Sequence, residues 1–155
     1  MKPSEIIRVI ICMILGSGLT FFAQPWFYQN KYVRIRDIPL KNWLGQDYWQ
    51  ASLTVYAIAV LITIIWLLMT AKANPKGADQ VLKWGLFWWI LLFLPIIGIG
   101  IALFLNRSAD ARVSLAACLV LDIFVLFWLP SVTSTPGSVK YVPPGAAFIR
   151  HLIGD

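Results

Sequence analysis

The sequence predicts an all-α integral membrane protein, a bundle of four transmembrane helices that forms a single domain over residues 1–155. Three observations predict this fold. The 155 residues are 59% hydrophobic and 13% charged, whereas soluble domains carry about 25% charged residues. Long stretches contain no ionised side chain at all. The apolar–polar alternation of a transmembrane β-barrel is absent, so helices are the structure that satisfies the backbone in lipid.

Charged residues divide the chain into apolar blocks. Residues 9–30, 48–71 and 84–106 contain no Asp, Glu, Lys or Arg, and residues 113–139 contain one, Asp122. A helix needs roughly 20 apolar residues to cross the hydrocarbon core. We therefore expect membrane spans near residues 6–23, 51–71, 84–105 and 112–132. The short connections between the later spans make those helices antiparallel neighbours.

The first span has two interpretations. Basic residues precede its apolar stretch, as they do in a cleaved signal peptide. Cleavage before Gln24 would place Phe21 where a small residue is needed, so we expect an uncleaved anchor. Gly16 and Thr20 form a small-xxx-small pair that lets another helix come close. We expect this pair to serve packing within the bundle, with a dimer interface as the alternative.

The segment 24–50 is predicted to be an interfacial loop. It mixes basic and apolar residues, most clearly at residues 31–36, and it is too short for a separate domain. We expect it to lie along the membrane surface, with Trp43 and Leu44 dipping in and the basic groups near lipid phosphates. Docking to a partner protein is the alternative interpretation.

Tryptophans gather near the ends of the predicted spans. Their rings have an apolar body and a polar N–H group, and such rings settle at the level of the lipid headgroups. An aromatic belt therefore explains most of the eight tryptophans without a cofactor. The predicted interfacial anchors are Trp26, Trp43, Trp49, Trp84, Trp88 and Trp89.

Pro95 lies in the middle of the third predicted span, and Gly98 and Gly100 follow it. A proline inside a helix removes one backbone hydrogen bond and clashes with the preceding turn. We therefore expect a kink near the centre of this span. It serves either packing or a functional hinge with an exposed backbone carbonyl, and packing is the simpler explanation.

The segment 133–155 is predicted to be an extramembrane tail. Pro136, Pro143 and Pro144 make its first part extended, and residues 145–153 are expected to form an amphipathic turn of helix. One interpretation is a tail that lies on the lipid surface. The other is a docking peptide for a partner, whose candidate residues are Phe148, Ile149, Arg150 and His151.

Asp122 is the one chemically unusual residue. It lies ten residues after Arg112, about 15 Å along a helix, which places it near the bilayer centre. An unpaired carboxylate there costs about 2.5 kcal/mol or more, so we expect Asp122 to be neutral or strongly hydrogen-bonded inside the bundle. Its predicted partners are Thr63, at a similar depth in the second span, and Tyr56 and Trp66, which lie about one to two turns away. A polar contact that locks helices together is the first interpretation, and a proton or cation site is the second.

Other chemistry receives little support from the sequence. Cys12, Cys118 and His151 are too few for a disulfide framework or a zinc site. The net charge of +6 comes from basic residues spread in ones and twos, so we expect no nucleic-acid partner. We also expect no catalytic residues, no metal and no cofactor, because no nucleophile–base pair or cluster of acids appears.

The sequence thus predicts a non-catalytic membrane protein, an accessory, assembly or regulatory subunit of a larger membrane complex. The alternative is a small proton- or cation-coupled carrier or channel component that uses Asp122. Its partners would be the lipid bilayer and other membrane subunits. We expect a bacterial inner membrane, with a thylakoid membrane as the alternative. Basic residues divide seven to six between the two sides, which slightly favours a cytoplasmic N-terminus.

Overall fold

Four long helices form the bundle, as the sequence predicts. The structure is a computed structural model that describes residues 2–33 and 35–154. Its long helices are Pro3–Gln29, Leu40–Ala71, Ala78–Leu105 and Arg112–Ser134, and each is long and apolar enough to cross a membrane. The prediction of four apolar helices is confirmed, while their insertion into a bilayer stays a prediction.

Three of these helices contain a short π-helical segment. The first consists of α1 (Pro3–Gly18), the π segment Leu19–Ala23 and α2 (Gln24–Gln29). The second consists of α3 (Leu40–Trp43), the π segment Leu44–Tyr48 and α4 (Trp49–Ala71). The third is α5 (Ala78–Leu105). The fourth consists of α6 (Arg112–Ile123), the π segment Phe124–Trp128 and α7 (Leu129–Ser134). A 3₁₀ turn, Gly137–Val139, and α8 (Ala146–Leu152) complete the chain.

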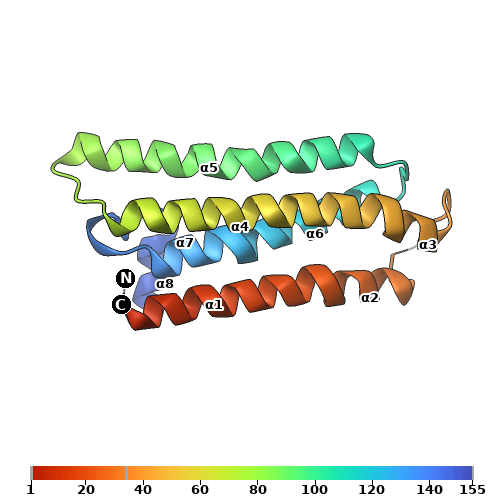
Figure 1. Cartoon of the computed structure of the whole chain (residues 1–155), viewed down its shortest axis with the longest axis horizontal. Coiled ribbons are helices and arrows are strands. Elements are labelled where there is room, and N and C mark those ends of the chain that lie inside the picture. The colour runs from red at the N-terminus through yellow and green to blue at the C-terminus, as the bar shows by residue number, and fades with distance from the viewer. Residues whose placement is uncertain (1, 34, 155) are drawn as a thin grey trace.

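Two helices are central and two are peripheral. Figure 1 shows α1 and α5 on opposite sides of the bundle, with α4 and the α6–α7 helix between them. In the second and fourth helices, 39% and 44% of the residues in the most apolar part are buried inside the bundle. In the first and third helices, these shares are 17% and 22%. The second and fourth helices therefore form the core on which the other two pack.

The peripheral helices expose wide apolar faces. On α1, Ile7 and Ile14 are exposed, and on α5, Phe93 and Phe104 are exposed, with Phe104 reaching 84%. Soluble monomers rarely expose contiguous apolar patches of this extent. The outer surface of the bundle is therefore suited to lipid or to other apolar helices.

Helix occupies most of the segment 24–50 that the sequence analysis predicts as a loop. The first long helix continues to Gln29 and the second begins at Leu40, which leaves only residues 30–39 as a connection. Pro25 lies in this helical part of the segment, although it has no N–H to donate. The π segment just before it accommodates this proline within a continuous helix. Arg34, one of the basic residues of this connection, lies outside the described residues.

The 30–39 connection is bound to the connection between the third and fourth helices. The carboxylate of Asp37 accepts hydrogen bonds from Ser108 Oγ at 2.7 Å and from the backbone N–H of Ala109 at 2.9 Å. Nearby, Arg107 forms a salt bridge with Asp47, with 2.8 Å between Nη2 and Oδ2. These contacts close one end of the bundle.

Protonation of Asp37 is expected to loosen this end. The hydroxyl of Ser108 lowers the pKa of Asp37 below its ordinary value of 3.8. The stabilisation is therefore complete above pH 3.8 and is lost as the pH falls through the lower pKa of the folded protein. The NMR shift of the Ala109 amide in detergent micelles should titrate with a midpoint below 3.8, and Asp37→Asn should abolish the titration. A midpoint at or above 3.8 would contradict the prediction.

The C-terminal tail forms the predicted helical turn but packs against its own chain. In α8, Phe148 and Leu152 are exposed, while Arg150 is only 2% exposed. Arg150 donates from Nε to the carbonyl of Val132 at 3.0 Å and from Nη2 to that of Thr135 at 2.6 Å. Carbonyl groups at a helix end lack intrahelical donors, and a cation is favourable at a helix C-terminus. Arg150 is therefore not available for an outside partner.

Arg150→Met is expected to lower the free energy of unfolding by about 2 kcal/mol, because two buried carbonyl groups would lose a charged donor. The thermal unfolding midpoint in detergent, followed by tryptophan fluorescence, should fall by roughly 4–8 °C. His151→Met is the matched control, since His151 is exposed on the same helix. Equal midpoints for both variants would show that Arg150 does not hold the tail.

Candidate functional site

Asp122 lies in the interior of the bundle, as predicted. It is fully buried on α6, just before the π segment Phe124–Trp128. Its Oδ1 atom accepts a hydrogen bond from Gln24 Nε2 at 2.7 Å, and Thr20 Oγ1 lies 3.0 Å away. The hydroxyl of Thr20 also lies 3.0 Å from the carbonyl oxygen of Gly16, so its single proton is shared between the two acceptors. The acid thus joins the fourth helix to the first.

Tyr48 connects the second helix to the same cluster. Its hydroxyl lies 2.7 Å from the carbonyl oxygen of Thr20 and 2.9 Å from Gln24 Oε1. All four side chains, those of Thr20, Gln24, Tyr48 and Asp122, are at most 3% exposed. We call this group the Asp122 cluster. It joins three of the four long helices through polar contacts in the interior of the bundle.

The π segments explain why the cluster forms where it does. At the end of the first π segment, the N–H of Gln24 donates to the carbonyl of Leu19, five residues earlier. Continuing this pattern, the carbonyl of Thr20 would need an N–H at Pro25, which has none. The hydroxyl of Tyr48 supplies the missing donor. Tyr48 itself ends the second π segment, in keeping with the frequent occurrence of such segments at functional sites.

Thr63 and Tyr56, two predicted partners of Asp122, form their hydrogen bonds with other residues. Thr63 Oγ1 lies 2.6 Å from the carbonyl oxygen of Leu126, a group to which Pro130 cannot donate. The hydroxyl of Tyr56 lies 2.9 Å from Ser17 Oγ. Both residues do join neighbouring helices, but at other points of the bundle. This corrects the prediction, which compared depth along the helices without knowing which faces meet.

The spacing of two actual partners of Asp122 is visible in the sequence. Thr20 and Gln24 are four residues apart, so they share one face of a helix. Gln24 is not among the predicted partners because the predicted first span ends before it, and Gln24 falls in the segment 24–50 that is predicted to be a loop. The close contact at Gly16 supports packing within the chain, because a Cβ atom there would lie 2.2 Å from Leu126 Cδ2.

The second carboxylate oxygen of Asp122, Oδ2, has no hydrogen-bond partner in the part of the chain that the structure describes. This oxygen is buried. No group of three His, Cys, Asp or Glu side chains in the same part of the chain is arranged to hold a metal ion. The cluster therefore offers one carboxyl group with an unused oxygen, surrounded by neutral donors and acceptors.

Two predicted interfacial anchors lie inside the bundle. Trp43 and Trp88 are at most 1% exposed. Their Nε1–H groups donate to Asn106 Oδ1 and to Ser131 Oγ, each at 3.0 Å. A buried indole N–H needs such a partner, and the sequence could not show which face of a helix each tryptophan occupies. For these two residues the prediction of headgroup contact is corrected.

The other four anchors differ in exposure. Trp26 and Trp89 are about half exposed, at 51% and 48%, and Trp49 and Trp84 are partly buried. Their depth in a bilayer stays a prediction. Trp66, which was not among the predicted anchors, is fully buried and donates to Thr135 Oγ1 at 2.7 Å. Some tryptophans thus link helices through their N–H groups, while others face outward.

Pro95 lies within the continuous helix α5. Pro95 and Gly98 are both buried. A Cβ atom at Gly98 would lie 3.3 Å from Ile58 Cδ1 of α4, so the glycine permits close contact between the two helices. Gly100 is exposed and has no such neighbour. The predicted kink and hinge stay predictions.

Comparison with known proteins gives no relative for this chain. No protein-family model matches the sequence, and neither a curated protein nor a solved structure gives a match. The function has to be inferred from the geometry and chemistry of the chain itself.

Proposed function

We propose that this chain is a non-catalytic membrane protein that acts as an accessory, assembly or regulatory subunit of a larger membrane complex. One observation carries the proposal. In the Asp122 cluster, buried polar side chains are bound to one another, while the outer faces of α1 and α5 are broad and apolar. Such a bundle is suited to packing against other apolar helices in a bilayer.

Two acids at the rim, Asp37 and Asp47, support the same proposal. Asp37 accepts hydrogen bonds from Ser108 and Ala109, and Asp47 is bound by Arg107. A general base or nucleophile would need to reach a substrate instead. These acids therefore serve to hold connections together. We place the complex in a bacterial inner membrane, with a thylakoid membrane as the alternative.

The tail supplies a second surface for a partner. Phe148 and Leu152 are exposed on α8, at 68% and 65%, although Arg150 fixes that helix to the bundle. A partner subunit would cover these two side chains without displacing the tail. Of the predicted docking residues, Phe148, Ile149 and His151 keep this role in the proposal, and Arg150 does not.

Cross-linking in native membranes followed by mass spectrometry tests the proposal. We expect a complex of fixed stoichiometry that survives mild detergent and is lost in the variant Phe148→Arg. Tyr141→Arg is the matched control, because Tyr141 is similarly exposed but lies outside α8. A chain that cross-links only to itself, or to no protein, in its native membrane would contradict the proposal.

The second candidate function is a proton- or cation-coupled carrier or channel component. The buried Oδ2 atom of Asp122, which has no partner within the described residues, favours it. Ion flux into liposomes containing the purified protein tests this candidate. Flux that Asp122→Ala abolishes would support it. Flux that Asp122→Ala leaves unchanged, or no flux in the wild type, would remove it.

A further inference from the structure

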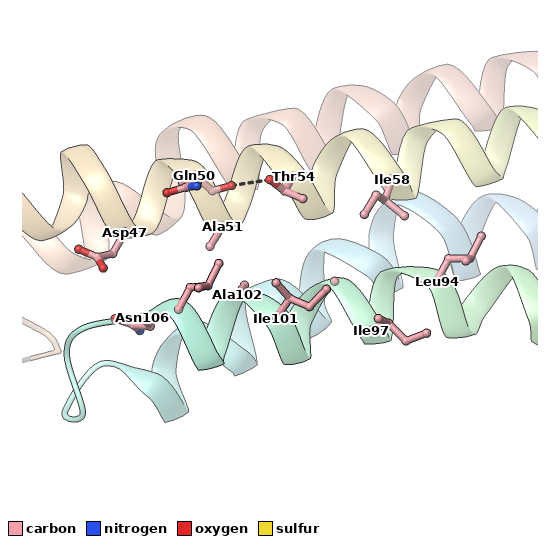
Figure 2. Close-up of a pocket in the computed structure, with 12 residues that line it drawn as sticks. Asp47, Gln50, Ala51, Thr54, Ile58, Leu94, Ile97, Ile101, Ala102 and Asn106 are labelled. Carbon is pink, nitrogen blue, oxygen red and sulfur yellow. Dashed lines mark hydrogen bonds between the residues drawn. The ribbon is translucent and has the colours of Figure 1, made fainter.

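A narrow groove runs between α4 and α5 on the outside of the bundle (Figure 2). It encloses about 210 Å³. Ile58, Leu94 and Ile97 line one part of it, and Asp47, Gln50 and Asn106 line the opposite end. We call it the α4–α5 groove. It is amphipathic along its length, apolar toward the middle of the bundle and polar at one end.

The length of the groove matches one leaflet of a bilayer. Leu94 and Asn106 lie twelve residues apart on α5, which corresponds to about 18 Å at 1.5 Å per residue. The hydrocarbon core of a bilayer is about 30 Å thick, so each leaflet contributes about 15 Å. The polar end coincides with the end of the helices. An acyl chain that enters at this end would reach the midplane within the groove.

A polar hollow adjoins the groove at this end. It is lined by Gly45, Gln46, Asp47, Gln50, Leu105 and Arg107. Asp47, Gln50 and Leu105 also line the groove, so the two spaces are adjacent. We call this space the Arg107 hollow. Together they form a two-part site, with an apolar channel for a hydrocarbon chain and a polar pocket for its headgroup.

Arg107 still has a nitrogen that can donate to a ligand. Its Nε and Nη2 atoms bind Asp47, and Nη2 also binds Gln46 Oε1 at 2.5 Å. Its Nη1 atom has no acceptor in the part of the chain that the structure describes. The side chain is 53% exposed. An oxygen of a phosphate group in the hollow would be a suitable acceptor, because guanidinium groups bind phosphate strongly.

Asn106 adds a second donor, which has no acceptor among residues 2–33 and 35–154. Its Oδ1 atom accepts from Trp43 Nε1 and from the backbone N–H of Ser108, both at 3.0 Å. These two donors fix the orientation of the amide. Its Nδ2 atom is buried and has no acceptor within the described residues. An ester oxygen at the end of the groove could accept this hydrogen bond after a small shift of the surrounding side chains.

We propose that the α4–α5 groove and the Arg107 hollow together bind one glycerophospholipid. One acyl chain lies along the groove, the phosphate accepts a hydrogen bond from Arg107 Nη1, and an ester oxygen accepts from Asn106. Because Asp47 neutralises Arg107, the hollow carries little net charge. It therefore selects a zwitterionic headgroup that carries an amine, as in phosphatidylethanolamine, over an anionic headgroup.

Native mass spectrometry of the delipidated protein in detergent tests the site. Phosphatidylethanolamine and phosphatidylglycerol are added in separate titrations. We expect one saturable phosphatidylethanolamine per chain, bound about tenfold more tightly than phosphatidylglycerol. Equal binding of both lipids in an unsaturable series would show ordinary contact with surrounding lipid and would overturn the proposal.

Two variants examine the two parts of the site. Ile101→Trp should fill the groove and abolish the saturable binding, whereas Ile90→Trp, at an exposed position of α5 outside the groove, should not. Arg107→Gln should weaken binding about tenfold. Thermal unfolding of each variant checks that it folds. Saturable binding that Ile101→Trp leaves unchanged, or that a folded Arg107→Gln leaves unchanged, would overturn the assignment.

Discussion

Replacing Gly16 by leucine is expected to destabilise the bundle more than any other single change considered for this chain. A Cβ atom at this position would lie 2.2 Å from Leu126 Cδ2 and 2.6 Å from its Cγ. Leu126 is fully buried, so it has little room to move aside. Overpacking of a core costs about 1–3 kcal/mol and occasionally more. Because a whole leucine side chain is added, we expect a loss of about 4 kcal/mol in the free energy of unfolding.

Gly18→Leu is the matched control for this prediction. A Cβ atom at Gly18 has no neighbour within 4 Å, and both variants replace a glycine near the end of the same helix. We expect the control to change stability by at most about 0.5 kcal/mol. Thermal unfolding in detergent micelles, followed by tryptophan fluorescence, measures both. Similar midpoints for the two variants would show that the contact between the first and fourth helices tolerates a side chain.

Removing the amide of Gln24 is expected to have the second-largest effect. Gln24→Leu deletes the 2.7 Å hydrogen bond to Asp122. It also removes the Oε1 atom of Gln24, which lies 2.9 Å from the hydroxyl of Tyr48. A fully buried acid would then keep only Thr20 as a donor. Leaving a buried polar group without partners costs about 1–3 kcal/mol, and more for a charged group. We expect a loss of about 3 kcal/mol and a fall in the unfolding midpoint of roughly 6–12 °C.

A double-mutant cycle separates the polar contact from simple packing. Replacing both partners of a buried hydrogen bond by apolar groups can be nearly neutral. The double variant Gln24→Leu/Asp122→Leu should therefore be more stable than Gln24→Leu alone. Asp122→Asn, which keeps an oxygen that can accept from Gln24, should lose about 1 kcal/mol or less. If the double variant is less stable than both Gln24→Leu and Asp122→Leu, the cluster does not act as a polar link between helices.

The lengths of three charge-free blocks, and of a fourth block that contains only one acid, were enough to predict four helices. Each block is longer than the roughly 20 residues that a span requires. The length of a block does not depend on how the helices pack. The ends of the first two helices were not predictable in the same way. Pro25 indicates a helix end by local rules. Only the π segment before it, together with the hydroxyl of Tyr48 from another helix, explains why the helix continues.

The tryptophans also show the difference between what the sequence predicts and what the tertiary structure decides. The sequence places Trp43 and Trp88 near the ends of apolar blocks, where an indole ring commonly meets lipid headgroups. Both rings instead lie in the interior, because Asn106 and Ser131 offer acceptors for their N–H groups. These acceptors lie 63 and 43 residues away along the chain. Spacing along the sequence contains no information about such pairs.

Composition and the order of charges determined that this chain is a set of four apolar helices, the fourth of which contains one acid, Asp122. Hydropathy reports the solvent that each segment needs, and that property is local. The tertiary structure decided which helix faces meet, and so decided that Thr20, Gln24 and Tyr48 surround the acid in place of Thr63 and Tyr56. Depth along a helix follows from the sequence, but rotation about its axis is set by packing against its neighbours.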